Sequence, residues 1–249
     1  FCGNANDESG NGSDGTVNGA MLTTDRFCNE NSAYYFDGVD DYVEVLDHNT
    51  LDLTTNMTLA AWFKNENNLQ VDEGILGKGE NDTNSGYALY HEVGVGLGET
   101  GYGLQDFPGI ISQAFIPSNS FPSNNWNFIV GTYDGAFMKL YMNGQLVTQT
   151  STAIVIEQSN INLFIGKELL NYRYFNGAID DITIHNRALD STEIQQLYTL
   201  GQYDITWSTG DTTSSITVQP TTTTTYSVTV SDGIGSCTDN ATVTVSVPP

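Results

Sequence analysis

A run of oxygen-bearing side chains and glycines opens the sequence at residues 4–12. Its members are Asn4, Asn6, Asp7, Glu8, Ser9 and Asn11, together with Gly10 and Gly12. Calcium takes about six to eight oxygen ligands, which carboxylates, amides and main-chain carbonyls of tight loops supply. The loop is not an EF-hand, because Gly15 stands where an EF-hand carries its bidentate glutamate. We predict a calcium site here; the alternative is that these side chains form only local Asx-turns.

Acidic residues in a catalytic arrangement are missing from the sequence. Many β-sandwich glycosidases carry their acids in a Glu-x-Asp-x-x-Glu pattern, because alternate residues of a strand share a face. The nearest approach, Glu80–Ser85, ends in serine and lies among Asn, Gly and Ser residues. No nucleophile elbow, His-Glu-x-x-His or phosphate-loop motif occurs, and the three histidines are scattered. The sequence therefore predicts a protein that is not an enzyme, with a carbohydrate-active enzyme as the alternative.

Aromatic residues in loop-rich stretches form a second set of candidates. Sugar rings stack their C–H faces on aromatic side chains, while nearby amides and carboxylates bind the hydroxyl groups. The candidates are Tyr87, Tyr90, His91, Tyr102, Phe107, Tyr172 and Tyr174. We expect some of them to line a rim that binds glycans. The alternative is that they are ordinary core or surface residues of a β-sandwich.

The charge balance limits the partners. The 249 residues carry 30 acidic and 7 basic side chains, for a formal net charge of −23. Such a surface repels nucleic-acid phosphates and anionic membranes, and no apolar run approaches the roughly 18 residues of a membrane helix. We therefore predict no nucleic-acid partner and no direct membrane insertion. Divalent cations and neutral glycans suit this charge, although solubility alone also explains it.

The cysteines and the overall composition favour an extracellular or cell-surface location. Lysine is rare, whereas Asn, Thr, Gly and Tyr are abundant. We predict a disulfide between Cys2 and Cys28, which leaves Cys237 as the odd cysteine; three free thiols are the alternative. Because no signal peptide opens the chain, we interpret it as a mature or excerpted piece of a longer product.

Short alternating runs separated by turn residues predict an all-β protein. The expected strands are 33–36, 41–45, 57–64, 86–92, 126–133, 137–142, 145–151, 163–166 and 178–185. Asn143-Gly144 predicts a two-residue type I′ hairpin, because both residues tolerate positive φ. One short helix should follow Asp190, with Glu193 completing a capping box and Gly201 ending it.

Residues 202–249 differ from the rest of the chain. They contain no Lys or Arg, and threonine dominates, with five in succession at 221–225. Further strands are expected at 203–207, 215–218, 226–230 and 241–247. We predict two domains, 1–201 and a small β unit at 202–249, which at this size needs to dock on something else.

The first domain resembles the laminin-G-like, concanavalin-A-like jellyroll family. The stretches that carry the resemblance are Gly3–Gly12, Ala33–Val43, Trp126–Gly144 and Phe175–Leu189. The tail resembles the Ig-like or PKD-like repeats of surface proteins of the Bacteroidetes type, through Ile205–Val218 and Thr225–Gly233. Such repeats usually have further strands before the tryptophan, and these are missing here.

The resemblance implies a fold and a metal site. The fold is a jellyroll β-sandwich of two antiparallel sheets with one short C-terminal helix, followed by a small Ig-like β unit. Family members commonly hold a structural calcium between the opening loop and the Ile-Asp-Asp of the last strand. By resemblance, the ligands for Ca²⁺ are therefore Asp7, Asn11 and Asp180, joined by Asp37 and Asp181.

Three functions remain open at this point. The first is an extracellular, calcium-dependent binding or adhesion module that recognises glycans or surface proteins. The second is a structural subunit of an extracellular fibre or array, which self-assembles when neighbours complete its strands. The third is an enzyme of the jellyroll type. We favour the first, because the sequence offers ligand-type side chains but no catalytic pair.

Overall fold

The structure is a computed structural model. It describes residues 1, 3–66, 73–79, 86–92, 99–105, 111–117, 124–156, 158–167, 174–200, 204–231 and 238–247. The chain divides into two compact units, Phe1–Ile194 and Gln195–Pro249. The division passes through helix α1 (Ser191–Thr199), whereas the sequence placed the boundary after Gly201.

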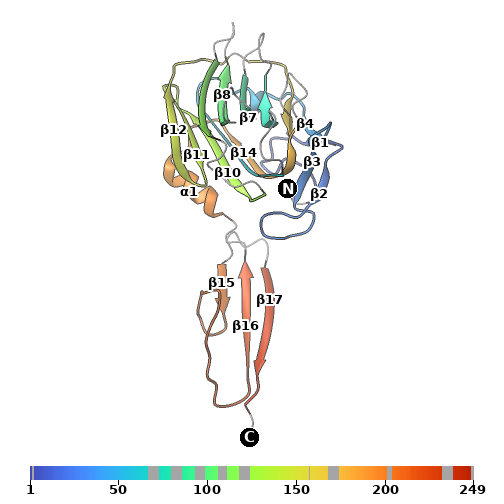
Figure 1. Ribbon diagram of the computed structural model, residues 1–249, viewed down its shortest axis with the longest axis vertical. Coiled ribbons are helices and arrows are strands. Elements are labelled where there is room, and N and C mark those ends of the chain that lie inside the picture. The colour runs from blue at the N-terminus through green and yellow to red at the C-terminus, as the bar shows by residue number, and fades with distance from the viewer. Residues whose placement is uncertain are drawn as a thin grey trace. The chain divides into compact units, whose positions relative to one another are not determined.

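The first unit is an antiparallel β-sandwich of two seven-stranded sheets (Figure 1). Sheet A has the order β1 (Gly15–Asn18), β4 (Tyr42–Val45), β13 (Leu163–Ile165), β6 (Glu73–Lys78), β7 (Gly86–Glu92), β8 (Glu99–Gln105) and β9 (Ile111–Pro117). Sheet B has the order β12 (Gln145–Ser151), β11 (Phe137–Met142), β10 (Asn127–Tyr133), β5 (Met57–Asn65), β14 (Asn176–His185), β3 (Ala33–Asp37) and β2 (Met21–Thr23). A short 3-10 helix, η1 (Asn49–Leu51), follows β4. The expected jellyroll sandwich is confirmed.

The core lies between the two sheets and follows from strand alternation. On β5, Leu59, Ala61 and Phe63 point into it, while the residues between them face the other side of sheet B. Val43 and Val45 on β4 fill it from sheet A. Burial of each of these Val, Leu and Phe side chains stabilises the fold by roughly 1.5–3 kcal/mol.

Two local predictions are confirmed in detail. Asn143 and Gly144 have φ of 50° and 77°, as the tight turn between β11 and β12 requires. Asp190 Oδ1 accepts hydrogen bonds from the main-chain nitrogens of Thr192 and Glu193, at 2.8 and 2.9 Å. The Glu193 carboxylate accepts in return from the Asp190 nitrogen at 3.0 Å, which completes the capping box at the start of α1.

Two buried polar groups lie at the two ends of β6. Lys78 is buried, and its ammonium donates to Asp47 Oδ1 at 2.6 Å and to the carbonyls of Ser159 and Ile161, with Asp52 Oδ1 at 3.3 Å. At the other end, the fully buried Glu73 carboxyl accepts a hydrogen bond from the Asn65 amide.

The sequence did not predict β6, because glycines and charged residues interrupt its apolar run; β1, β2, β8 and β9 were missed as well.

The second unit contains one antiparallel sheet in the order β15 (Asp204–Trp207), β16 (Thr224–Ser231) and β17 (Thr238–Val245). The strand expected at residues 215–218 is wrong: the segment has no regular secondary structure and joins no sheet of the described chain. In the described residues, no helix has the length and apolar character needed to span a membrane.

Candidate functional site

An aromatic cluster lies on the outer face of sheet A, where β4 pairs with β13. The register places Phe164 opposite Glu44, and Tyr42 lies two residues before Glu44 on the same face. Val43, Val45 and the neighbours of Phe164 point the other way, into the core. The Tyr42 and Phe164 rings meet edge to face at 5.8 Å, and both are half-buried.

Lys167 completes the cluster. Its Nζ lies 3.8 Å from the centroid of the Tyr42 ring and 3.9 Å from that of Phe164. Burial lowers the pKa of this ammonium, and the negative charge of Glu44 partly opposes the effect. Gly166 sets the turn that leads to Lys167: its φ is +81°, and an added Cβ would lie 2.3 Å from the Phe36 ring. Only glycine fits there, so the core fixes where Lys167 emerges.

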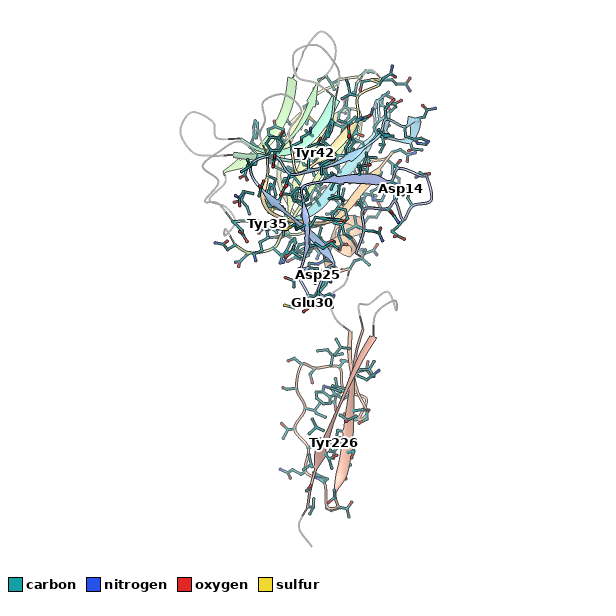
Figure 2. All side chains as sticks on the ribbon, turned by 90° about the vertical axis from the view of Figure 1, so that its right-hand side faces the viewer. Asp14, Asp25, Glu30, Tyr35, Tyr42 and Tyr226 are labelled. Atoms are coloured by element: carbon teal, nitrogen blue, oxygen red, sulfur yellow. The ribbon has the colours of Figure 1, made fainter. Side chains whose placement is uncertain are left out.

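Polar groups border the two rings. Asn162 Nδ2 donates to Glu44 Oε1 at 2.8 Å, and Asn162 Oδ1 accepts from the Asp47 nitrogen at 2.9 Å. This fixes Glu44 and leaves its Oε2 available to a ligand hydroxyl. We call Tyr42, Glu44, Asn162, Phe164 and Lys167 the β4–β13 patch. Figure 2 labels Tyr42, which lies on the side of the jellyroll that carries β1 and β4.

Small residues continue this face beside the patch. Across sheet A, Phe164 pairs with Gly77, Gly77 with Ala88, and Ala88 with Gly103, so these positions share the outer face. A Cβ on Gly77 would lie 3.1 Å from the Ala88 Cβ. Gly77 is buried and Ala88 is half-buried, so the side chains that border the two rings on this face are small.

The structure places the predicted glycan-binding residues differently. Tyr174 forms a bridge with Lys167 and so lies next to the β4–β13 patch. The expectation of a rim position is wrong for Tyr87 and Tyr90, which are 3% and 6% exposed. Tyr87 donates its hydroxyl to the Leu51 carbonyl at 2.9 Å, and burial raises its pKa. Tyr90 packs edge to face on Phe115 at 5.9 Å.

The remaining aromatic candidates are only partly covered by the structure. His91 lies on β7 opposite Glu73, and Tyr102 lies on β8, opposite Leu89 and Ala114. Tyr172 and Phe107 lie outside the described residues. Sequence reasoning missed Tyr42, Glu44, Phe164 and Lys167. The signal for Tyr42, Glu44 and Phe164 was present in the sequence, because each alternates with core Val, Leu or Ile residues and must therefore face outward.

The opening loop is held together by its own side chains. Asp7 accepts from the Ser9 nitrogen through Oδ1 at 2.9 Å and from the Ser13 nitrogen through Oδ2 at 3.0 Å. The hydrogen bonds, first that of the Ser9 side chain, hold the pKa of Asp7 below its ordinary value. Asn11 donates its amide to Ser9 Oγ at 2.8 Å. Both carboxylate oxygens of Asp7 thus accept local main-chain hydrogen bonds, as the Asx-turn alternative predicts.

Asp180 and Asp181 face cations of the chain instead of the opening loop. Asp180 Oδ1 accepts from the main-chain nitrogen of Phe1 at 2.7 Å, and Asp181 Oδ2 accepts from Arg26 at 2.6 Å. The Arg26 guanidinium also lies over the rings of Phe27 and Trp62, at 4.3 and 4.4 Å. Burial raises the pKa of Asp180, and the amino group of Phe1 opposes this. These contacts occupy the positions that the resemblance gave to a calcium ion.

A different acidic group converges at the turn between β3 and β4. Asp37, Asp40 and Asp41 each place a carboxylate oxygen within 4.8 Å of the others, and they are the one such group of three or more among the described residues. Asp37 Oδ1 accepts from the Val39 nitrogen at 2.8 Å, and Asp41 Oδ2 from the Asp37 nitrogen at 3.0 Å. Burial, joined by the charges of Asp37 and Asp40, raises the pKa of Asp41.

Only one of the predicted calcium ligands lies in this group. Carboxylates that repel one another around a turn are the donors a hard divalent cation requires. Of the five predicted ligands, only Asp37 belongs to the group; Asp7 and Asn11 remain in the opening loop, and Asp180 and Asp181 are paired with cations. The resemblance gave no means of finding Asp40 and Asp41.

The predicted disulfide would join Cys2 to Cys28. Cys28 is exposed, and its predicted partner Cys2 lies outside the described residues. Gly3 lies next to the loop that contains Cys28, since a Cβ on Gly3 would be 3.9 Å from the Asn31 carbonyl oxygen. Phe1 packs edge to face on Tyr34 at 4.8 Å. The Cys2–Cys28 link therefore stays a prediction.

Two packed antiparallel sheets with an aromatic cluster on an outer face define a lectin-like jellyroll. Residues 37–195 match the family model Laminin_G_3, described as the concanavalin A-like lectin/glucanases superfamily. The chain belongs to this family. No curated protein matches the chain.

Solved structures share the fold at low sequence identity. The binding domain of Paraclostridial Mosquitocidal Protein 1 is 19% identical, with a TM-score of 0.65 over 80% of this chain and 50% of that one. The botulinum neurotoxin serotype G binding domain is 20% identical, with a TM-score of 0.60 over 77% and 47%. This chain thus spans about half the length of the toxin domains. Domain 4 of AbnA, an extracellular arabinanase of Geobacillus stearothermophilus solved with arabinotriose, is 20% identical, with a TM-score of 0.59 over 78% and 93%.

Proposed function

We propose that this chain is a non-catalytic, extracellular module that binds glycans through the β4–β13 patch. The observation that carries the proposal is the juxtaposition of two half-exposed rings with a fixed carboxylate and an ammonium on one sheet face. Ring faces suit the C–H faces of a sugar, and Glu44 Oε2 and Lys167 suit its hydroxyl groups. The patch carries one carboxylate, whereas glycoside hydrolysis uses two.

The solved relatives support this proposal by analogy of fold. Two of them are toxin binding domains, and the third is an arabinanase domain crystallised with arabinotriose. The net charge of −23 favours neutral glycans over acidic ones. Adhesion at a cell surface is the setting that we propose for such a module, with the tail as an Ig-like unit of the same protein.

Calcium dependence is the second part of the proposal, and Asp37, Asp40 and Asp41 are the residues that would hold the ion. Asp41 directly precedes Tyr42, so the turn that carries the carboxylates also leads into the patch. Neutralising three close carboxylates would order this turn and thereby the position of the Tyr42 ring. A cation there acts as a structural element and takes part in no reaction.

A glycan array followed by calorimetry tests the proposal. We expect Tyr42→Ala and Phe164→Ala each to weaken binding of the strongest glycan by about tenfold, or about 1.4 kcal/mol. Tyr35→Ala is the matched control: Tyr35 is a half-exposed tyrosine on sheet B, and Figure 2 labels it beside Tyr42. The proposal is wrong if no glycan binds, or if the three variants bind equally well.

A further inference from the structure

The sheet of the second unit has one apolar face and one hydroxyl-rich face. Trp207 pairs with Val228, which pairs with Ala241, and Tyr226 pairs with Val243. Directly opposite residues of antiparallel strands share a face. The apolar face of β15–β17 carries Ile205, Trp207, Tyr226, Val228, Val230, Ala241, Val243 and Val245, with Thr224 and Asp239 at its ends.

The opposite face is polar and already satisfied. Thr225 and Thr244 join their hydroxyls at 2.9 Å across β16 and β17, and Thr229 donates to Asn240 Oδ1 at 2.6 Å. This face therefore suits solvent. The difference between the two faces indicates that the apolar one is built to pack on another layer.

Nothing in the described unit buries the apolar face. Among residues 205–230 and 240–247, whose side chains are described, none is buried. Val243 is 56% exposed. A three-stranded sheet gains stability from a hydrophobic face packed against something, and an exposed apolar patch of this kind marks an interaction site.

In the described part of the chain, a segment without backbone pairing follows β15. The Trp207 indole donates to the Thr213 carbonyl at 2.9 Å, which holds the start of the segment that follows β15 against the sheet. From Ser215 to Gln219, exposed residues alternate with half-buried Ile216 and Val218, the pattern of a strand with one face covered. Within the described residues, the backbone of this segment forms no hydrogen bond to another backbone group. Figure 1 shows it as a coil between β15 and β16.

We propose that the second unit accepts an extended β-strand from a partner protein. The strand would pair with Ser215–Gln219 and lay alternate apolar side chains on the apolar face of β15–β17. Two separate observations meet here: an apolar face that lacks a second layer, and the segment Ser215–Gln219, whose backbone lacks a backbone partner within the described residues. A strand satisfies both, whereas a helix or a small molecule would leave the backbone groups unpaired.

Charge identifies the class of partner. Residues 202–249 contain four aspartates, at 204, 211, 232 and 239, and no Lys or Arg. The register places Asp239 opposite Val230, at one end of the apolar face. The outward residues of the incoming strand should therefore be basic or neutral. A second copy fits less well, because it brings the same negative charge of −23.

The test uses the complete 249-residue chain and hydrogen exchange of peptides that cover Ser215–Gln219. The probe is the synthetic peptide Lys-Val-Thr-Val-Lys-Ile-Thr-Val-Lys. One control peptide has proline in place of the central lysine, and another has glutamate in place of all lysines. We expect the probe to slow exchange of this segment at least about tenfold, the proline peptide to do nothing, and the glutamate peptide to bind at least about tenfold more weakly.

Two matched variants on one strand separate the apolar face from the unit as a whole. Val243→Asp places a charge on the apolar face, and Thr242→Asp places it on the hydroxyl-rich face next to it. Both positions are exposed, so both variants should keep the fold. We expect Val243→Asp to abolish the protection by the probe and Thr242→Asp to retain it.

Three results would overturn the proposal. Light scattering that finds a dimer, with Ser215–Gln219 protected and Val243→Asp dissociating it, would make a second copy the occupant. A monomer whose segment is protected without the probe would show that the unit satisfies itself. Fast exchange that no peptide changes at saturating concentration would show that the segment accepts no strand.

Discussion

Replacing Glu73 by glutamine is expected to remove a pH-dependent weakness of the jellyroll. Glu73 and Asn65 are buried, and the Asn65 amide donates to Glu73 Oε2. Within the part of the chain that the structure describes, Glu73 Oε1 and Asn65 Oδ1 have no hydrogen-bond partner. A proton on Oε1 would donate to Oδ1 and complete a cyclic acid–amide pair. Burial favours this state, since it raises the pKa of Glu73 from 4.5 to about 8.

The sign and the size of the effect follow from linkage. Because the folded pKa is above the unfolded one, the stabilisation is complete below pH 4.5 and is lost as the pH rises through about 8. At about 1.36 kcal/mol for each pH unit between these values, the loss reaches at most about 5 kcal/mol. In Glu73→Gln, a permanent amide donates to Asn65 Oδ1 and accepts from Asn65 Nδ2, so this dependence disappears.

The assay is guanidinium denaturation followed by tryptophan fluorescence between pH 5 and pH 9. The variant should be about as stable as the parent at pH 5 and several kcal/mol more stable at pH 8.5. Subtracting the two curves cancels other titrating groups, such as Asp180. Glu66→Gln is the control, because Glu66 is an exposed acid close by in sequence and should leave the slope unchanged. Equal slopes for the parent and Glu73→Gln would refute the reasoning.

Three further predictions concern the metal, the cysteines and the buried lysine. Saturating calcium should raise the melting temperature of the parent by about 5 °C or more, because a ligand at 100 times its Kd adds about 2.7 kcal/mol to the free energy of unfolding. Asp40→Asn should abolish this rise, and Asp7→Asn should leave it unchanged. Peptide mapping without reduction should find Cys2 joined to Cys28, and free thiols at both would end that prediction. Lys78→Met should lower the free energy of unfolding by about 3 kcal/mol, because its half-buried carboxylate partners Asp47 and Asp52 lose their cation; a loss under about 1 kcal/mol in denaturation would contradict this.

Sequence reasoning succeeded where local chemistry decides the structure. The Asn143-Gly144 turn and the Asp190–Glu193 capping box depend on neighbouring residues alone, and both were predicted. Sequence reasoning failed where contacts with residues distant in sequence decide the position of a side chain. Tyr87 lies on β7, which pairs with β6 and β8. Whether its side chain faces the core depends on how these strands pair, and spacing along the chain does not give that pairing.

The candidate site shows the same limit. Alternation alone could have placed Tyr42 and Phe164 on an outer face, but their contact depends on β4 pairing with β13. Asp180 has the same carboxylate as a calcium ligand, and only the folded chain shows that Phe1 and Arg26 reach it first.

The contacts of Arg26 have a mechanical consequence. Asp181 of β14 is tied to Arg26, and Asp180 beside it is tied to Phe1, so the opening residues are fastened to the last jellyroll strand. A pull on the two ends of the jellyroll acts first on these ion pairs and on the pairing of β14 with β3. The β4–β13 patch lies on the other sheet, outside this load path. Load on these contacts therefore falls on sheet B, whereas the β4–β13 patch belongs to sheet A.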